Sequence, residues 1–482
     1  MNYKMIRYIL GTMLKVEALL MCLPALVSLL YREGDFRPFL WTILIAAGAG
    51  LLAGRRPQNT VIYAREGFII TSLSWICMSL VGALPFWFMG AIPSYVDAVF
   101  ETVSGFTTTG ATILTDVEAM SHGLLFWRSF THWMGGMGVL VFLMAILPLA
   151  GGRGLHIMRA ESTGPAVGKL VSRVGNTAKI LYGIYISMTV ILTVLLLVGG
   201  MPLYDSVVHA MGTAGTGGFG IWADSIAHYD SAYIDLVLSV GMLAFGINFN
   251  IYFLLLMGKT KSALLSEELR WYLGIITGAT LLIAWNILPE MGGILQSLRY
   301  AFFQVTSVIS STGFATADFN LWPELSRSLL LGLMMIGACA GSTGGGAKVS
   351  RFLIMLKSAK KEINQLLHPR SVRVLKFEDK PVEDGTVRNV FSYFFILVFI
   401  IIVSTLVVSL DNMDFDSTFS AVVSCANNIG PGLGVVGPMG GYASLSVLSK
   451  LVLILDMLLG RLEIFPVLML FAPSVWAGRR RK

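Results

Sequence analysis

The stretch Ser104-Gly105-Phe106-Thr107-Thr108-Thr109-Gly110-Ala111-Thr112 decides the fold that we predict for this chain. It follows a short apolar run, residues 98–103, and it precedes a long apolar segment that begins near Leu124. Consecutive threonines followed by a glycine favour extended backbone, because β-branched residues and glycine are both poor helix formers. Irregular backbone at membrane depth is tolerated only where it is buried in protein or lines a watery path. Residues 107–112 therefore predict a pore loop.

The same pattern recurs three more times along the chain. Aligning the sequence with itself places Gly110 in register with Gly217, Gly313 and Gly430. The third copy is the clearest, since residues 301–313 repeat the order of apolar, hydroxyl and glycine positions in residues 98–110, and the fourth has drifted furthest. Internal repeats of this kind predict repeated structural units. Four equivalent loops indicate pseudo-fourfold packing around one axis.

Glycine-bearing loops of this kind are suited to binding a bare cation. In potassium channels, rings of backbone carbonyls replace the hydration shell of the ion, and glycine permits the backbone angles that turn successive carbonyls inward. The alternative, that small residues only let helices approach closely, is disfavoured because the clusters recur in register outside the helices. The predicted K⁺-binding residues are Thr108, Thr109, Gly110, Gly215, Thr216, Gly217, Ser311, Thr312, Gly313, Asn428, Ile429 and Gly430.

Composition identifies a polytopic membrane protein. The chain has 482 residues, of which 55% are hydrophobic and 13% are charged, and its mean hydropathy is +0.74. A soluble protein of this length would need more charge on its surface. The net charge of +7 arises from basic loops between apolar segments, so it does not predict nucleic-acid binding. The cysteines and histidines show no spacing typical of disulfide frameworks, zinc sites or metalloenzymes. We therefore expect no enzyme activity and no cofactor bound by this chain.

The apolar segments divide the chain into five units. Segments long enough to cross the membrane, roughly 30 Å of hydrocarbon, lie near residues 7–31, 39–54, 67–90, 124–150, 179–200, 231–258, 270–290, 325–357, 388–410 and 447–476. Shorter apolar pieces, each leading into one glycine loop, lie near residues 97–106, 204–214, 297–309 and 416–426. The predicted fold is all-α: two extra N-terminal transmembrane helices in residues 1–58, then four helix, pore-helix, loop and helix repeats around one pore. The repeats are predicted at residues 59–152, 153–262, 263–384 and 385–482.

Basic residues predict the orientation. Most lysines and arginines outside the apolar segments lie in residues 55–66, 151–178, 259–270, 351–388 and at the C-terminus, whereas the segments that hold the glycine loops carry almost none. The positive-inside rule then places both termini in the cytoplasm and the loops toward the outside of the inner (plasma) membrane. A short helix that enters from outside directs the negative end of its dipole at the bilayer centre, which favours a cation there.

The chain resembles the Trk/Ktr/HKT superfamily of potassium transporters, and specifically its Trk-type membrane subunit. The resemblance covers nearly the whole chain, and the two extra N-terminal spans are typical of the Trk type. It implies channel-like K⁺ uptake, a homodimer embedded in membrane lipid, and a cytoplasmic regulatory subunit that binds nucleotide (RCK-type). The second loop departs from the pattern, with Ala214-Gly215 where the first has two threonines. The motifs that carry the resemblance are residues 106–112, 127–129, 133–138, 216–219, 248–249, 340–348 and 460–465.

A glycine-rich stretch, residues 337–346, interrupts an apolar segment. It is not a phosphate-binding loop, because no Gly-Lys-Ser/Thr sequence is present and no strand precedes it. A broken helix beneath the filter is the better interpretation, and the resemblance implies that the break is an intramembrane gate. A static kink packed against its neighbours is the alternative. The predicted gate residues are Gly341, Ser342, Thr343, Gly344, Gly345, Gly346 and Arg461.

Arg461 lies near the middle of the last apolar segment, too far from its basic end for the side chain to reach water. A central arginine is costly in a membrane, so we expect it to face the bundle interior or a cavity. The resemblance implies a positive barrier in the pore. The alternative is that Glu463 or loop carbonyls neutralise the charge and use it to join helices.

Three other functions were weighed. The potassium-binding subunit of an ATP-driven pump would have similar loops, but the motifs match the Trk type more closely. A sodium/potassium-permeable relative is disfavoured because all four predicted filter positions are glycine, whereas a serine at the first goes with sodium permeation in the superfamily. An intramembrane enzyme is disfavoured because no Ser/His pair, paired aspartates or metal-ligand set occurs within the spans.

Overall fold

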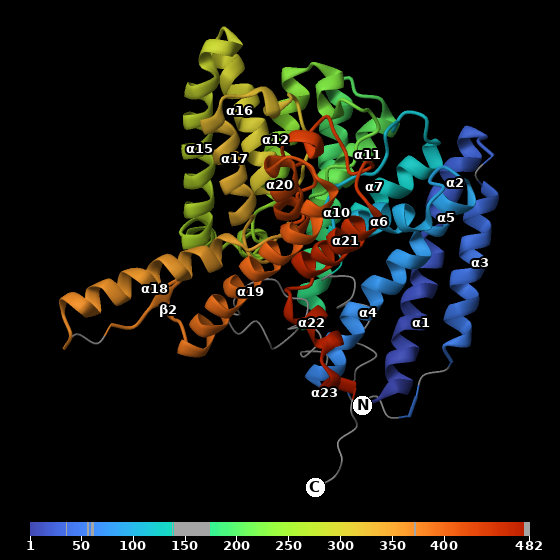
Figure 1. The fold of residues 1–482 in the computed structure, drawn as a ribbon, viewed down its shortest axis with the longest axis horizontal. Helices are drawn as coiled ribbons and strands as arrows, with labels where there is room; N and C mark the ends of the chain where they lie inside the picture. Colours follow the sequence, from blue (N-terminus) through green and yellow to red (C-terminus); the bar gives the residue numbers. More distant parts are fainter. Residues whose placement is uncertain are drawn as a thin grey trace.

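The computed structural model describes residues 1–34, 36–54, 57–58, 62–136, 138, 174–370 and 373–476. The described chain is almost entirely helical, as expected for a polytopic membrane protein (Figure 1). The helices before the first glycine loop and just after it are α1 (Tyr3–Leu20), α2 (Cys22–Tyr31), α3 (Phe36–Leu52), α4 (Ala64–Gly82), α5 (Leu84–Phe88), α6 (Tyr95–Phe106) and α7 (His122–Gly136). Those of the middle of the chain are α10 (Val174–Val198), α11 (Leu203–Gly215), α12 (Ala232–Phe245), α13 (Phe249–Leu256), α14 (Thr260–Leu264), α15 (Glu267–Met291), α16 (Ile294–Ile309), α17 (Glu324–Ile336) and α18 (Val349–Leu367).

The C-terminal part holds the only strands among the described residues. They form a two-residue-loop hairpin, β1 (Lys376–Phe377) and β2 (Lys380–Pro381), in which Phe377 pairs with Lys380. The helices that follow are α19 (Asp384–Val408), α20 (Phe415–Ala426), α21 (Val447–Arg461), α22 (Phe465–Phe471) and α23 (Pro473–Trp476). Short 3₁₀ turns lie at Ser225–Tyr229, Phe319–Leu321, Ser409–Asp411 and Gly434–Val436.

Five described helical segments are long and apolar enough to cross a membrane, and the bent pair α12–α13 makes a possible sixth. The five are Tyr3–Tyr31, Arg65–Phe88, Lys179–Val198, Glu267–Met291 and Asp384–Asp411. The chain is therefore a multi-pass membrane protein. The crossings predicted near 325–357 and 447–476 each contain a broken helix, and the one predicted near 124–150 extends beyond the described residues.

In the described part of the chain, three of the helix breaks bear on the glycine loops, and only one of these three was predicted. The predicted break separates α17 from α18. A second lies between α12 and α13, whose axes differ by 89°. The third lies between α21 and α22, where Glu463 and Ile464 both have positive φ angles of 64° and 60°. A freed backbone group at such a break needs a partner inside the protein, because lipid offers none.

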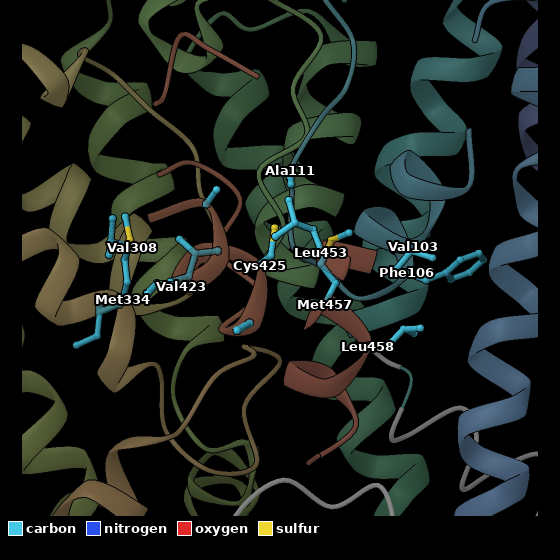
Figure 2. Close-up of a cluster of buried hydrophobic side chains, with 14 of the residues drawn as sticks. Val103, Phe106, Ala111, Val308, Met334, Val423, Cys425, Leu453, Met457 and Leu458 are labelled. Atoms are coloured by element: carbon cyan, nitrogen blue, oxygen red, sulfur yellow. The ribbon is translucent and has the colours of Figure 1, made fainter. Parts of the chain in front are cut away.

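Four short helices, α6, α11, α16 and α20, lie where the sequence predicts them, and each leads into a glycine loop. Their side chains are buried among the longer helices. Figure 2 shows Val103 and Phe106 of α6, Val308 of α16, and Val423 and Cys425 of α20 in one apolar cluster with α17 and α21. Burial at about 25 cal/mol per Å² of apolar surface holds these short helices in place, although none could form a stable isolated helix.

The N-terminal helices and α15 lie on opposite sides of this core (Figure 1). In Figure 1, helices α1 to α3 stand on one side of the molecule and α15 on the opposite side, while α20 and α21 lie between them. Helix α1 packs on α3 and α4, and α2 packs on α7. The far end of α18 projects from the bundle beside β2. The two additional N-terminal helices therefore pack outside the short helices and do not contribute loops to them.

Candidate ion-binding site

Each short helix ends in a residue with left-handed backbone. Thr108, Thr216, Ser311 and Asn428 have φ angles of 55°, 55°, 57° and 56°. Positive φ is unfavourable for any residue with a Cβ, and especially for β-branched threonine. Strain of this kind persists only where surrounding structure enforces it, and it concentrates at functional sites. Four segments that lie far apart in the sequence therefore share the same left-handed backbone conformation.

The residue after each left-handed one closes the same hydrogen bond. Thr109 N donates to Ser104 O at 2.9 Å and Thr312 N to Ser307 O at 2.9 Å. Gly217 N donates to Gly212 O at 2.9 Å, and Ile429 N donates to Ser424 O at 3.0 Å. Each bond reaches back five residues, so it fixes the structural register of the loops.

That register places Gly218 beside Gly110, Gly313 and Gly430, one residue later than the sequence alignment, which used Gly217. The adjacent glycines Gly217 and Gly218 make the two alignments equally good by sequence. The backbone bonds decide between them, because Gly217 corresponds to Thr109 and not to Gly110. Gly217 instead lies against His132, whose ring carbon Cγ would be 2.5 Å from an added Cβ.

The four equivalent glycines each lie against the next loop. A Cβ on Gly110 would be 2.7 Å from Gly218 N, and one on Gly218 would be 2.7 Å from the carbonyl carbon of Gly313. A Cβ on Gly313 would overlap the carbonyl oxygen of Ile429, and one on Gly430 would be 2.6 Å from Thr109 O. No side chain fits at these positions, so the backbones of the four loops approach one another directly.

A cavity of about 390 Å³ opens onto the loops. The four glycines all line it, whereas Gly217 does not, and most of the remaining wall comes from the segments that follow the first, second and fourth loops. Tyr442 belongs to this wall and donates its hydroxyl to Gly430 O at 2.7 Å. The cavity thus gives access to backbone groups that would otherwise be enclosed in protein.

A buried ion pair holds the first loop. Glu101 on α6 accepts hydrogen bonds from Thr112 Oγ1 at 2.9 Å, Ile113 N at 3.0 Å and Arg128 Nε at 2.8 Å. The arginine also reaches the second loop, because its Nη1 donates to Gly220 O at 3.1 Å. The two charges, both nearly inaccessible, therefore fix two loops relative to α6 and α7.

His132 joins the same two loops. Its Nδ1 lies 2.8 Å from Gly105 O, and its Nε2 accepts from Phe219 N at 3.3 Å. The carbonyl of Gly105 needs a donor, so Nδ1 carries a proton, and the amide of Phe219 needs an acceptor, so Nε2 is unprotonated. These two hydrogen bonds therefore fit the neutral imidazole. In a protonated ring Nε2 would also carry a hydrogen, and this N–H would face the N–H of Phe219.

Hydroxyl and amide side chains hold the third and fourth loops. Ser307 donates to Phe314 O at 2.6 Å, and Ser420 accepts from Leu433 N at 2.7 Å. Asn428 donates to Thr109 Oγ1 at 2.9 Å and to Met457 O at 2.8 Å, which ties the fourth loop to the first. Sequence analysis missed Glu101, Arg128 and His132. A Glu and an Arg near apolar segments could have been singled out as costly charges, but nothing in the sequence marks His132.

The stretch between α17 and α18, residues 337–348, is called here the intramembrane loop. It fills the break between α12 and α13, since Cys339 N donates to Gly246 O at 3.1 Å and Phe249 N donates to Gly341 O at 3.0 Å. Thr343 donates its hydroxyl to Phe245 O at 3.2 Å. The loop thereby satisfies backbone groups that the break leaves open.

The intramembrane loop presses against the third and fourth glycine loops. Gly345 N donates to Ser311 Oγ at 2.8 Å. A Cβ on Gly344 would be 2.9 Å from Ser310 O, and one on Gly345 would be 2.6 Å from Asn428 Cβ. The glycines of this loop are needed for close approach. Every predicted gate residue from Gly341 to Gly346 lies in this one loop.

Arg461 ends α21 and contacts the intramembrane loop. Its Nη1 donates to Thr343 O at 2.7 Å and its Nη2 to Gly135 O at 2.8 Å. The side chain is 7% exposed, so it faces the interior as the cost of a membrane-depth arginine requires. Glu463 forms an ion pair with Arg351 of α18. The backbone carbonyls of the intramembrane loop and α7 are therefore bonded to the guanidinium.

The chain as a whole is similar to known proteins. The model of the TrkH family, described as cation transport protein, matches residues 36–289 and 290–477. The Trk system potassium uptake protein TrkH of Salmonella typhimurium is 36% identical, over 99% of this chain and 100% of that protein. The Trk system potassium uptake protein TrkG of Escherichia coli K12 is 33% identical, over 98% of this chain and 99% of that one.

A solved structure agrees with these sequence matches. The crystal structure of the potassium transporter TrkH from Vibrio parahaemolyticus superposes with a TM-score of 0.89 at 34% identity, covering 99% of this chain and 100% of that one. The resemblance predicted from the motifs is confirmed. This chain, with its four glycine loops and its intramembrane loop, belongs to the TrkH family of cation transport proteins.

Proposed function

We propose that this chain takes up K⁺ across the inner (plasma) membrane through a channel-like pore whose filter is the ring of four glycine loops. The observation that carries the proposal is that Gly110, Gly218, Gly313 and Gly430 each lie against the next loop and all line one cavity. Close-packed backbone leaves carbonyl oxygens as the available ligands, and carbonyl oxygens suit a bare alkali ion. Relatives named as potassium uptake proteins favour K⁺ as the ion.

The pore is built from four pseudo-fourfold repeats. Supporting this, each short helix packs on the helix that follows the glycine loop of the preceding repeat: α6 on α21, α11 on α7, α16 on α12 and α20 on α17. Three of these four contacts carry an ion pair. Lys450 of α21 pairs with Asp97 of α6 at 2.8 Å, and Arg299 of α16 pairs with Asp235 of α12 at 2.7 Å. Arg327 of α17 pairs with Asp416 of α20 at 2.8 Å. These links run in one direction around the loops, as a closed ring requires.

The intramembrane loop is the gate of this pore. It lies against the third and fourth loops through Gly345 and is joined to Arg461 through Thr343. In this position the loop obstructs the pore, and the positive charge of the Arg461 guanidinium repels a cation. Opening requires the loop to leave the break between α12 and α13, which then needs water in place of the lost hydrogen bonds.

The partners follow the family. The chain functions as a homodimer, and a cytoplasmic RCK-type subunit that binds nucleotide controls the gate. Both termini lie in the cytoplasm, on the side where the basic connectors gather. The relatives are named as parts of a "Trk system", which fits a membrane component of a larger assembly.

The test is ion flux in liposomes that contain the purified protein. We expect K⁺ and Rb⁺ to permeate and Na⁺ to permeate far less. Gly313→Ser puts a Cβ against the carbonyl oxygen of Ile429 and should lower K⁺ flux together with the preference for K⁺ over Na⁺, whereas Gly220→Ala, whose Cβ meets no atom closer than 3.6 Å, should change neither. Equal loss of K⁺ flux in both variants, or no K⁺ flux in the unaltered protein, would contradict the proposal.

A further inference from the structure

Glu268, in the first turn of α15, binds the intramembrane loop and the first turn of the helix that follows it, α18. Its Oε1 accepts a hydrogen bond from Ala340 N at 2.7 Å and another from Ser350 N at 3.1 Å. The residue is 4% exposed, so water does not compete for these bonds. Amide bonds to a carboxylate are stronger than those to a neutral acceptor. One carboxylate oxygen therefore joins the beginning of the loop to the start of α18.

The bond to Ser350 also completes α18. The helix begins at Val349, and its preceding residue, Lys348, provides no side-chain cap. The first N–H groups of a helix need acceptors, and the positive end of the helix dipole favours an anion. Glu268 supplies the acceptor and the negative charge from a neighbouring helix. The place where the intramembrane loop ends and α18 begins thus depends on Glu268.

A second carboxylate places Glu268. Glu378 lies in the turn between β1 and β2, where it and Asp379 have positive φ angles of 52° and 58°. Its Oε1 accepts from Ser266 Oγ at 2.8 Å and from Glu268 N at 3.1 Å. Ser266 is the N-cap residue of α15. Glu378 therefore caps the turn from which the Glu268 side chain reaches the intramembrane loop.

The hairpin that carries Glu378 is attached to both helices. Lys357 of α18 donates to Lys376 O of β1 at 2.9 Å and pairs with Glu267 of α15 at 2.5 Å. The hairpin belongs to the connector between α18 and α19, on the side predicted to be cytoplasmic. The two-residue turn thus connects that surface to the intramembrane loop in two steps. Glu378 caps the first turn of α15, and Glu268 in that turn caps α18 and binds the loop.

We propose that Glu268 is the positioning residue that holds the intramembrane loop against the ion-binding loops, and that Glu378 controls it from the hairpin. Displacing the hairpin removes the Glu378 acceptor from the first turn of α15, moves Glu268 and frees the amides of Ala340 and Ser350. The inference rests on the proposed function, in which this loop is the gate. It adds the residues that hold the gate shut and the surface through which a cytoplasmic partner would act.

The position of the loop can be followed without measuring flux. Cys339 lies in the intramembrane loop, is fully buried, and is a free thiol. In a background with Cys22→Ala, Cys77→Ala and Cys425→Ala it is the single cysteine of the chain. The rate at which 2-aminoethyl methanethiosulfonate modifies Cys339 in the full-length protein in liposomes then reports loop displacement, and Rb⁺ flux in the same liposomes reports opening.

Glu268→Ala removes the acceptor of both amides, and we expect Cys339 modification and Rb⁺ flux each to rise about tenfold. Glu268→Gln keeps a carbonyl oxygen of the same reach and should give intermediate rates, and it decides the question where the alanine variant fails to fold. Unchanged Cys339 modification in the folded variants would overturn the inference. Faster modification without added flux would support the role of Glu268 but refute the intramembrane loop as gate.

Glu378→Gln tests the second cap. We expect a rise in Cys339 modification in the same direction as for Glu268→Ala but smaller, and no further rise when Glu378→Gln is added to Glu268→Ala, because Glu378 acts through Glu268. Asp379→Asn changes the exposed neighbour in the same turn and is the matched control, expected to behave as the unaltered protein. Fully additive rates in the double variant would refute the coupling between the two carboxylates.

Discussion

Arg128 and Glu101 form an ion pair of 2.8 Å that is almost completely buried behind the first glycine loop. The same arginine lies over the ring of Phe219, with its guanidinium carbon 3.9 Å from the ring centroid. The Arg128 side chain therefore contacts both Glu101, which holds the first loop, and Phe219 of the second loop. Removing the positive charge leaves the Glu101 carboxylate buried and without its cationic partner.

We expect Arg128→Met to lower the free energy of unfolding by about 3–5 kcal/mol, the usual cost of breaking a buried pair. It should also weaken the preference for K⁺ over Na⁺, because the first two loops lose their common support. Thermal unfolding in detergent and paired ion fluxes measure the two effects. The double variant Arg128→Met with Glu101→Gln should recover part of the stability, and Arg270→Gln, an exposed arginine, should change neither property. An unaltered unfolding midpoint in Arg128→Met would show that the pair does not support the loops.

Gly218→Ala should abolish K⁺ flux. Its Cβ would lie 2.7 Å from Thr312 O and from the carbonyl carbon of Gly313, and backbone atoms cannot rotate away as a side chain can. Gly220→Ala places its Cβ 3.6 Å from the nearest atom, His209 Nε2, at ordinary contact distance. Liposome flux of the two variants should therefore differ strongly although they lie two residues apart. Unchanged K⁺ flux through Gly218→Ala would show that Gly217, and not Gly218, is the filter glycine of the second loop.

The existence of the loops could be predicted from the sequence, but the register of one could not. Glycine after a short apolar segment is a signal that recurs in all four copies, so the helices α6, α11, α16 and α20 were placed to within a few residues. At Gly217-Gly218 the sequence allows two alignments. Only the backbone bond from Gly217 N to Gly212 O distinguishes them.

The helix breaks show a similar limit. The break before α18 is marked by its glycines, and Pro466, just after the break before α22, could have indicated that one too. The break between α12 and α13 has a weaker mark, because only Gly246 and Asn248, the N-cap of α13, interrupt the apolar run there. That break is stabilised by the intramembrane loop, which comes from a distant part of the chain. Local sequence cannot contain a signal that depends on such a contact.

Asp414 offers a pH-dependent test of the support for the fourth loop. It caps α20, and hydrogen bonds from Ser417 Oγ at 2.6 Å and Ser417 N at 3.0 Å hold the pKa of its carboxyl below the usual value. A lowered folded-state pKa means that the stabilisation is complete above the unfolded value of about 3.9 and is lost as the pH falls through the folded one.

We expect Asp414→Ala to cost about 1 kcal/mol of unfolding free energy at neutral pH, as for other N-cap residues. The difference from the unaltered protein should shrink as the pH is lowered below about 4. Asp414→Asn keeps one of the two acceptor oxygens and does not titrate, so its stability at neutral pH should lie between those of Asp414→Ala and the unaltered protein. Thermal unfolding across this pH range measures both. A difference that stays constant down to low pH would mean that the carboxylate charge is not involved.

Arg461 provides the most direct test of the gate, because its two backbone bonds predict a result that differs from that of a simple charge barrier. If the bond to Thr343 O holds the intramembrane loop, losing one charge-assisted bond of about 1.5–3 kcal/mol should shift the loop equilibrium by about tenfold or more. Arg461→Ala and Arg461→Gln should then both increase Rb⁺ flux. Arg461→Lys keeps the charge but cannot span two carbonyls with a planar fork, so it should also increase flux, whereas a pure charge barrier predicts no increase for lysine. Liposome flux of the three variants, normalised to folded protein by size-exclusion chromatography, separates these outcomes. Loss of folded protein in all three with no gain in flux would instead assign Arg461 to the joining of α21 and α7 through Gly135 O.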